Sequence, residues 1–256
     1  PSLWEGEKIV GTIIAVTAAA GMGGTGLGGL AAYLFRRGTD RTVSVLLSFA
    51  AGMMLAVVCA DLLTDAIQAG PGLSALPAAS ASVLAGCGGI WLLEELVSGL
   101  QAGAKRGGLF LAGVVMAAAI ALHNLPEGMV IGASYAADLA EAGQDGRMMA
   151  LVIGLHNIPE GMAVAVPLAA GGASRGRAVL TTAAAGAPTV LGAVLGFCLG
   201  TMGPGLQMLT LGGASGAMLY VVFGELLPES FRLCRSPAPV MAAVLGVLTG
   251  MGVVLG

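Results

Sequence analysis

The sequence predicts an all-α integral membrane protein that forms a single transmembrane domain over residues 1–256. Three observations predict this class. Apolar residues make up 57% of the chain and charged residues only 10%, whereas a soluble domain carries about a quarter charged residues. The mean hydropathy is +0.92, and the apolar residues fall in runs of about 20, the length that spans a bilayer. The 43 glycines fit closely packed helices, because small residues let helix backbones approach each other in lipid.

Eight segments reach the length that a membrane span requires, and short connections separate them. The third segment is bounded at its start by Pro71 and Pro77, and most of the others meet a connection that contains basic residues. No connection is long enough for a separate soluble domain. The predicted helices cover residues 9–35, 42–68, 77–100, 109–136, 148–168, 178–201, 206–227 and 240–254.

Basic residues mark alternate connections and so predict the orientation of the helices. Nine of the 11 lysines and arginines lie in the first, third, fifth and seventh connections, whereas Lys8 and Arg147 lie on the other side. Cytoplasmic loops are enriched in these residues, so both chain termini are predicted to be extracytoplasmic. The alternation also supports an even number of spans. The nine residues are Arg36, Arg37, Arg41, Lys105, Arg106, Arg175, Arg177, Arg232 and Arg235.

A hexapeptide, H-N-x-P-E-G, occurs twice and contains both histidines of the chain. The first copy lies in the fourth predicted helix and the second in the fifth, which runs in the opposite direction. In each copy histidine and glutamate are four residues apart and share one helical face. At about 1.5 Å per residue, both copies lie near the middle of a hydrocarbon core about 30 Å thick. The two helices are therefore predicted to form a pocket lined by His123, Glu127, His156 and Glu160.

The chemistry of this pocket favours a divalent metal ion. An acidic residue at the bilayer centre costs about 2.5–3.5 kcal/mol on insertion scales. This free energy argues against a role for Glu127 and Glu160 that is limited to holding two helices together. A purely structural His–Glu pair is the alternative. Imidazole and carboxylate without thiolate suit Zn²⁺, Fe²⁺ or Mn²⁺. The four cysteines are scattered singly without a CxxC spacing, which excludes a disulfide framework and a thiolate zinc site.

Further candidate ligands lie at a similar depth. Pro126 and Pro159 lack an N–H and therefore free the carbonyls of Leu122 and Leu155, which either bind an ion or water or mark a packing kink. Met54 lies at about the same depth in the second helix. A thioether favours softer ions, although most membrane methionines serve packing.

A second repeat places acidic pairs at opposite ends of two helices. Asp61-Leu-Leu-Thr-Asp65 ends the second predicted helix at the outer face, and Glu225-Leu-Leu-Pro-Glu229 ends the seventh at the inner face. Inverted repeats of this kind are typical of transporters that expose one midplane site to either side. One pair is predicted to gather cations outside and the other to receive them inside; the alternative is that these carboxylates are merely solvated helix ends.

These residues resemble the ZIP family of divalent-metal transporters, particularly its bacterial GufA-like branch. The resemblance is carried by SFAAGMML, HNLPEGM, HNIPEGMAVAVPL and ASGAMLYVVFGELLPES, of which the doubled HNxPEG is highly specific. It implies eight helices in a 3+2+3 inverted arrangement in the bacterial inner membrane, with metal uptake toward the cytoplasm by a homodimer. It also implies a primary metal site formed by His123, Glu127, Glu160 and Met54, and a second site to which Asn124 and Asn157 belong.

The chain departs from the two-metal pattern of some family members. Asn157 is neutral where those members carry aspartate, and Thr189 stands where they carry glutamate. With two anionic ligands missing, one bound ion is expected. Zn²⁺ is the expected transported substrate, with Fe²⁺, Mn²⁺ or Cd²⁺ as further candidates, and no organic cofactor is expected.

The alternative function is an intramembrane metal-dependent hydrolase. A zinc protease would require H-E-x-x-H, whereas asparagine follows histidine here and a proline interrupts the turn. The hexapeptides therefore do not suit the hydrolytic chemistry of a zinc protease. The expected partners are metal ions, the lipid bilayer and a second copy of the chain, and the absence of a long basic run excludes nucleic acid.

Overall fold

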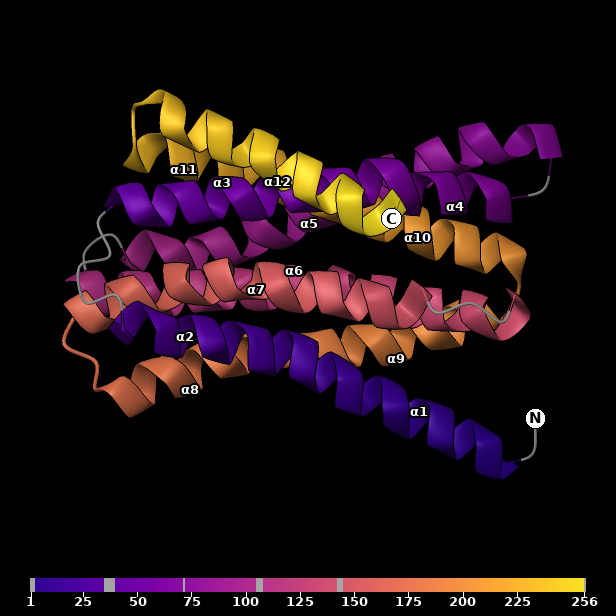
Figure 1. Cartoon of the computed structure of the whole chain (residues 1–256), viewed down its shortest axis with the longest axis horizontal. Coiled ribbons are helices and arrows are strands. Elements are labelled where there is room, and N and C mark those ends of the chain that lie inside the picture. The colour runs from indigo at the N-terminus through magenta and orange to yellow at the C-terminus, as the bar shows by residue number, and fades with distance from the viewer. Residues whose placement is uncertain (1–2, 35–39, 71, 105–107, 142–144, 256) are drawn as a thin grey trace.

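Apolar segments in lipid have no water to satisfy their backbone, so they must form helices. The computed structural model describes residues 3–34, 40–70, 72–104, 108–141 and 145–255. This part of the chain is helical almost throughout and contains no strand, which confirms the all-helical membrane class. The helices lie side by side in one elongated bundle (Figure 1).

The described residues form eight helical rods, three of which contain a π-helical turn. The first is α1 (Leu3–Ala18), η1 (Ala19–Gly23) and α2 (Gly24–Leu34), and the second is α3 (Asp40–Val57), η2 (Val58–Leu62) and α4 (Leu63–Ala69). After the short turn η3 (Gly72–Ser74) come α5 (Ala75–Ala104), α6 (Gly108–Glu141), α7 (Asp145–Ala170), and α8 (Arg175–Ala185) with α9 (Pro188–Thr201). The last two are α10 (Pro204–Val221), η4 (Val222–Leu226) and α11 (Leu227–Leu233), and α12 (Pro237–Leu255).

Seven of these rods are long and apolar enough to cross a membrane. The remaining rod, α6, is 34 residues long and carries the polar residues of HNLPEG in its middle. Most helices extend a few residues beyond the predicted ranges. The π-helical turns were not predicted, nor was the interruption between α8 and α9, where Pro188 lacks the N–H that would continue α8 and instead occupies the first turn of α9.

The charged ends of the bundle can be followed in Figure 1. Arg41 is the second residue of α3, Arg175 begins α8 and Arg232 lies in the last turn of α11. These helix ends share the left-hand end of the bundle. Lys8 lies near the start of α1 and Arg147 near the start of α7, both toward the opposite end. Arg36, Arg37, Lys105 and Arg106 lie outside the described residues.

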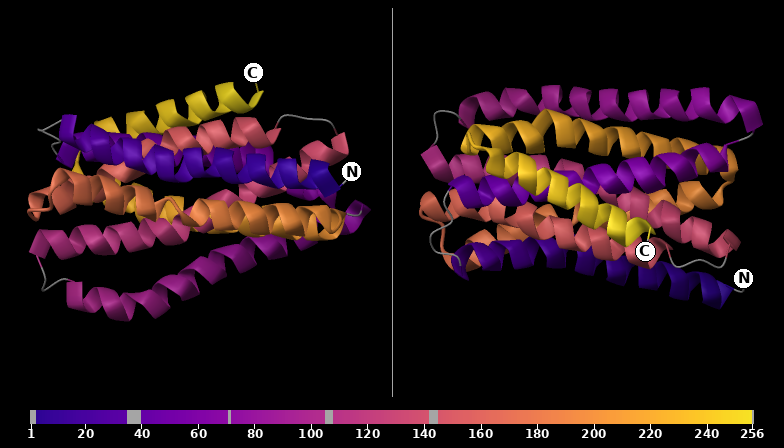
Figure 2. Two further views of the ribbon diagram at one scale, coloured as in Figure 1. Left: turned by 90° about the horizontal axis from the view of Figure 1, so that it is seen from below. Right: turned by 45° about the horizontal axis from the view of Figure 1, so that its top comes forward.

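The two helices that carry the repeated hexapeptide lie in the middle of the bundle. In Figure 1, α6 and α7 separate the rods α3–α4 and α12 on one side from α1–α2 and α8–α9 on the other. In the most apolar part of α7, 72% of the residues are buried. In that of α5, which lies at the edge of the bundle in Figure 2, only 17% of the residues are buried. The fold therefore removes the hexapeptides from lipid and leaves the peripheral helices facing it.

Glycine permits the close approach of α2 to α7. A Cβ atom on Gly28 would overlap the carbonyl oxygen of Ile158 and lie 2.9 Å from the Cα of Gly161. Gly28→Ala is therefore expected to push α2 away from HNIPEG and to destabilise the protein by about 1–3 kcal/mol, the usual cost of overpacking. Thermal unfolding in detergent measures the effect.

Gly11→Ala is the matched control for this substitution, because it lies in the same rod and a Cβ there would meet no atom within 4 Å. Its melting temperature should equal or exceed that of the wild type, since alanine is the better helix former. Equal melting temperatures for the two variants would contradict the close α2–α7 packing.

Candidate metal centre

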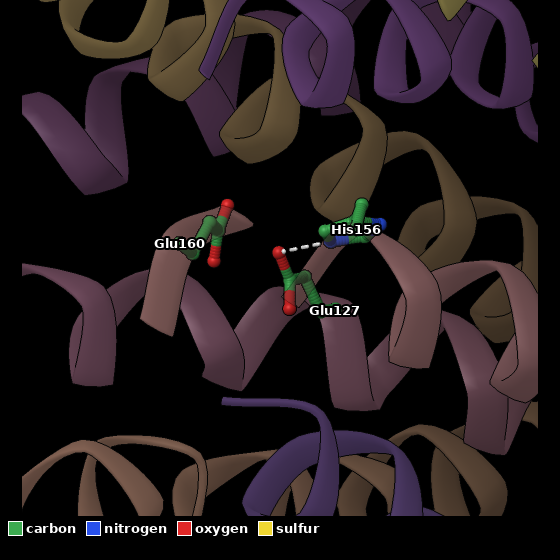
Figure 3. Close-up of side chains that lie close together, drawn as sticks. All are labelled: Glu127, His156 and Glu160. Atoms are coloured by element: carbon green, nitrogen blue, oxygen red, sulfur yellow. Dashed lines mark hydrogen bonds and ion pairs between the residues drawn. The ribbon is translucent and has the colours of Figure 1, made fainter. Parts of the chain in front are cut away.

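The antiparallel packing of α6 against α7 brings the two hexapeptides together. Glu127 comes from α6, and His156 and Glu160 come from successive turns of one face of α7. One ligand atom from each of the three side chains lies within 4.8 Å of the others. His156 Nε2 lies 2.9 Å from Glu127 Oε1, and the carboxylate of Glu160 lies beside them (Figure 3). One ion can therefore contact all three residues after only small side-chain movements.

The cluster is buried, and most of its carboxylate oxygens lack a hydrogen-bond partner in the described part of the chain. Glu127 and Glu160 are both 0% exposed and His156 is 2% exposed. The second oxygen of Glu127 and both oxygens of Glu160 have no hydrogen-bond partner among the described residues. An ionised carboxylate that is buried without a partner costs several kcal/mol, so this arrangement favours the binding of a proton or of a metal cation. Two carboxylates and one imidazole match the charge and the ligand preference of a borderline dication.

His123, the first histidine of the repeat, lies outside this cluster and faces a cavity. Its Nε2 atom lies 2.8 Å from Oε1 of Glu225, which belongs to the π-helical turn η4. The cavity measures about 320 Å³ and extends from His123 past Glu225 to Glu229 and Arg232. Glu229 accepts a hydrogen bond of 2.7 Å from Nε of Arg232 at the end of α11. These polar side chains line one cavity between the centre of the bundle and its arginine-rich end.

The two asparagines of the repeat belong to a neutral hydrogen-bond network. Asn124 donates to the carbonyls of Ile120 and Ala185, and its Oδ1 accepts from the Thr189 hydroxyl at 3.0 Å. Asn157 donates to the Ala20 carbonyl at 3.2 Å and to Asn124 Oδ1 at 3.4 Å. The amide oxygen of Asn124 is therefore already occupied by donors. This network ties α6, α7, α9 and η1 together beside the cluster.

The other predicted site residues are distributed around the centre. Met54 is 1% exposed and lies in α3, which packs against α7. Asp61 is half-buried in the π-helical turn η2, and Asp65 lies in the first turn of α4. The structure thus brings Glu127, His156 and Glu160 together and places His123 with Glu225 instead.

Sequence reasoning missed two features of this region. The first is Arg232, which lines the cavity and pairs with Glu229, and the i, i+3 spacing of the two residues was the available signal. The second is the pair of π-helical turns that carry Asp61 and Glu225. No sequence signal for a π-helical turn was present, because such turns depend on packing rather than on composition.

Membrane-length helices around a buried His–Glu–Glu cluster define an integral membrane protein with a candidate site for a metal cation. The sequence model of the family described as ZIP zinc transporter matches residues 98–256. This match, together with relatives that are similar along most of the chain, shows that the chain belongs to the ZIP zinc transporter family. Because the family consists of transporters, the hydrolase alternative is not supported.

Several relatives match along most of the chain. It is 35% identical to the zinc transporter ZIPB of Bordetella bronchiseptica over 252 residues, which cover 93% of this chain and 77% of ZIPB. It is 32% identical to the zinc transporter ZupT of Chlorobium limicola over 261 residues, 94% of each chain. A shorter match, 40% identity over 114 residues and 44% of each chain, is to the zinc transporter GufA of Myxococcus xanthus.

Proposed function

We propose that this protein carries Zn²⁺ across the inner membrane toward the cytoplasm through a site between α6 and α7. The observation that carries the proposal is the buried cluster of Glu127, His156 and Glu160, in which one ligand atom of each residue lies within 4.8 Å of the others and three carboxylate oxygens have no hydrogen-bond partner among the described residues. Relatives named zinc transporters support Zn²⁺ as the substrate. Fe²⁺, Mn²⁺ and Cd²⁺ suit the same donor atoms and are further candidate substrates.

The basic residues and the cavity support the proposed direction of transport. The end of the bundle that holds Arg175 and Arg232 is the cytoplasmic end by the positive-inside rule. The cavity that begins at His123 opens toward that end, past Glu225 and Glu229. An ion leaving the cluster therefore meets an imidazole and then carboxylates on its way to the cytoplasm. Asp61 and Asp65, toward the opposite end, are proposed to gather ions outside.

The same assignment places eight helices across the membrane with both termini extracytoplasmic. The beginning of α1 and the end of α12 point toward the same end of the bundle, in support of an even number of crossings (Figure 1). We further propose a homodimer with a single metal ion in each chain. The single ion is supported by Asn157 and Thr189, which donate to Asn124 and contribute no negative charge.

The test is metal flux into liposomes that contain the purified protein and an internal metal-sensitive dye. Saturable Zn²⁺ entry is expected, and Fe²⁺, Mn²⁺ and Cd²⁺ are offered as competitors. Crystals soaked in Zn²⁺ should give one anomalous scattering peak per chain between Glu127, His156 and Glu160. No flux, or an ion bound elsewhere, would refute the proposal.

Glu225→Gln is expected to slow transport by about tenfold or less. Glutamine keeps an oxygen that can accept a hydrogen bond from His123. The increase in the activation free energy of transport should therefore not exceed the net contribution of one hydrogen bond, about 0.5–1.5 kcal/mol. Glu225→Ala removes the acceptor altogether and should slow transport further. Initial rates of Zn²⁺ entry over a concentration series measure both, and wild-type kinetics in both variants would reduce Glu225 to a solvated helix end.

A further inference from the structure

Two rods of the bundle contain similar segments that run in opposite directions. The segments AAGMMLAVVCADLLTD, residues 50–65, and ASGAMLYVVFGELLPE, residues 214–229, align without a gap and are identical at eight of 16 positions. Each contains a π-helical turn at the same aligned place, Val58–Leu62 in one and Val222–Leu226 in the other. The two rods run in opposite directions in Figure 1. Asp61 is therefore the structural counterpart of Glu225.

The hexapeptides complete the same symmetry. His123 and Glu127 on α6 correspond to His156 and Glu160 on α7, which runs antiparallel to α6. An inverted repeat relates the contact of His123 with Glu225 to a contact of His156 with Asp61. It likewise relates the contact of His156 with Glu127 to a contact of His123 with Glu160.

The contacts in the structure break this symmetry. His123 Nε2 lies 2.8 Å from Glu225, and His156 Nε2 lies 2.9 Å from Glu127. The counterpart acceptors are not used in the same way, since both oxygens of Glu160 lack a hydrogen-bond partner among the described residues. Glu225 and Glu229 line a cavity of about 320 Å³ together with His123. The two halves of the repeat thus differ in the carboxylates that their histidines contact.

We propose that Asp61 and His156 form a second cation-binding pair, which assembles when the central site faces the outside. In that conformation His156 leaves Glu127 for Asp61, and His123 leaves Glu225 for Glu160. The inference rests on the proposed transport function and deepens it, because it names the residues that meet a divalent ion on its arrival. Inverted repeats produce two states by exchanging the roles of their halves, and the exchange of partners follows from that rule.

The exchange keeps the number of His–carboxylate contacts constant. Each state contains one such pair at the side that is open and one between α6 and α7. Two states built from equivalent contacts differ little in free energy, so the binding of an ion can shift the population between them. The π-helical turns place the carboxylates of Asp61 and Glu225 at the same position of their rods, as this exchange requires.

Cysteine cross-linking tests the pairing directly. In a variant whose four cysteines are replaced by serine, one double substitution combines His123→Cys with Glu225→Cys, and a second combines Asp61→Cys with His156→Cys. A short bifunctional thiol reagent, applied to the full-length protein in liposomes, is expected to cross-link both pairs. Asp65→Cys with His156→Cys is the matched control, one helical turn farther along the rod, and should cross-link at less than about a tenth of that yield.

The outcomes separate this inference from the proposed function. Cross-linking of the first pair without the second overturns the pairing of Asp61 with His156, as does equal cross-linking of the Asp65 control. Zn²⁺ flux in the cysteine-free parent is measured alongside, and its absence contradicts the proposed function instead. In the otherwise unchanged protein, Asp61→Asn should raise KM for external Zn²⁺ about tenfold with little change in maximal rate, as expected for the loss of one supporting carboxylate. An unchanged KM also overturns the inference.

Discussion

Zn²⁺ entry is expected to fall to the background of empty liposomes when Glu160 is replaced by glutamine. The substitution preserves the shape of the side chain and removes one of the two buried negative charges that compensate the ion. Loss even of a supporting residue costs about 10- to 100-fold in metal affinity, so the loss of a direct carboxylate ligand should cost at least about 100-fold. Initial rates of Zn²⁺ entry at matched protein incorporation measure the effect.

Although Glu160→Gln should abolish transport, it should not destabilise the metal-free protein. Both oxygens of Glu160 are buried and lack a hydrogen-bond partner within the described part of the chain, so Glu160→Gln removes a costly buried acid and should not lower the melting temperature of the metal-free protein. Zn²⁺ at 100 times its Kd stabilises a protein by about 2.7 kcal/mol, and this stabilisation should disappear in the variant. Asp40→Asn, at an exposed position at the start of α3, is the control and should retain both Zn²⁺ entry and the stabilisation by Zn²⁺. Normal transport by Glu160→Gln would mean that the metal site is misassigned.

His123→Ala is also expected to abolish transport, for a different reason. His123 lies outside the tight cluster and forms the inner wall of the cavity with Glu225. Without its imidazole, an ion that leaves Glu127, His156 and Glu160 loses the ligand that lies beside the carboxylate of Glu225. We expect the transport rate to fall at least about 100-fold, on the scale of a lost ligand, while Zn²⁺ still raises the melting temperature because the cluster is intact.

A pair of measurements therefore distinguishes the two residues. Glu160→Gln should lose both the thermal stabilisation by Zn²⁺ and the flux, whereas His123→Ala should lose the flux alone. His123→Gln, whose amide can still donate to Glu225, serves as the conservative variant and should recover part of the rate. If His123→Ala also loses the Zn²⁺-dependent stabilisation, His123 belongs to the primary binding site, as the family resemblance implies.

Much of the architecture was predictable because it depends on local and additive properties. Apolar length and the scarcity of charge specify membrane helices, and the spacing of four residues places His156 and Glu160 on one helical face. The antiparallel hexapeptides also follow from counting residues, because each lies near the middle of its helix. The family could be recognised for the same reason, since its motifs are continuous in the chain.

The tertiary structure decided which of these side chains meet. A helical period determines the face on which a residue lies, but not how far a helix is rotated or shifted along its neighbour, and a shift of one turn changes every contact. Only the packing of α6 against α7 places His156 rather than His123 beside Glu127, and only the π-helical turn η4 carries Glu225 to His123. The occupation of Asn124 by Thr189 likewise joins residues that are 65 positions apart. The amino-acid sequence by itself determined the membrane helices and their polar residues, whereas the partners of those residues depend on long-range packing.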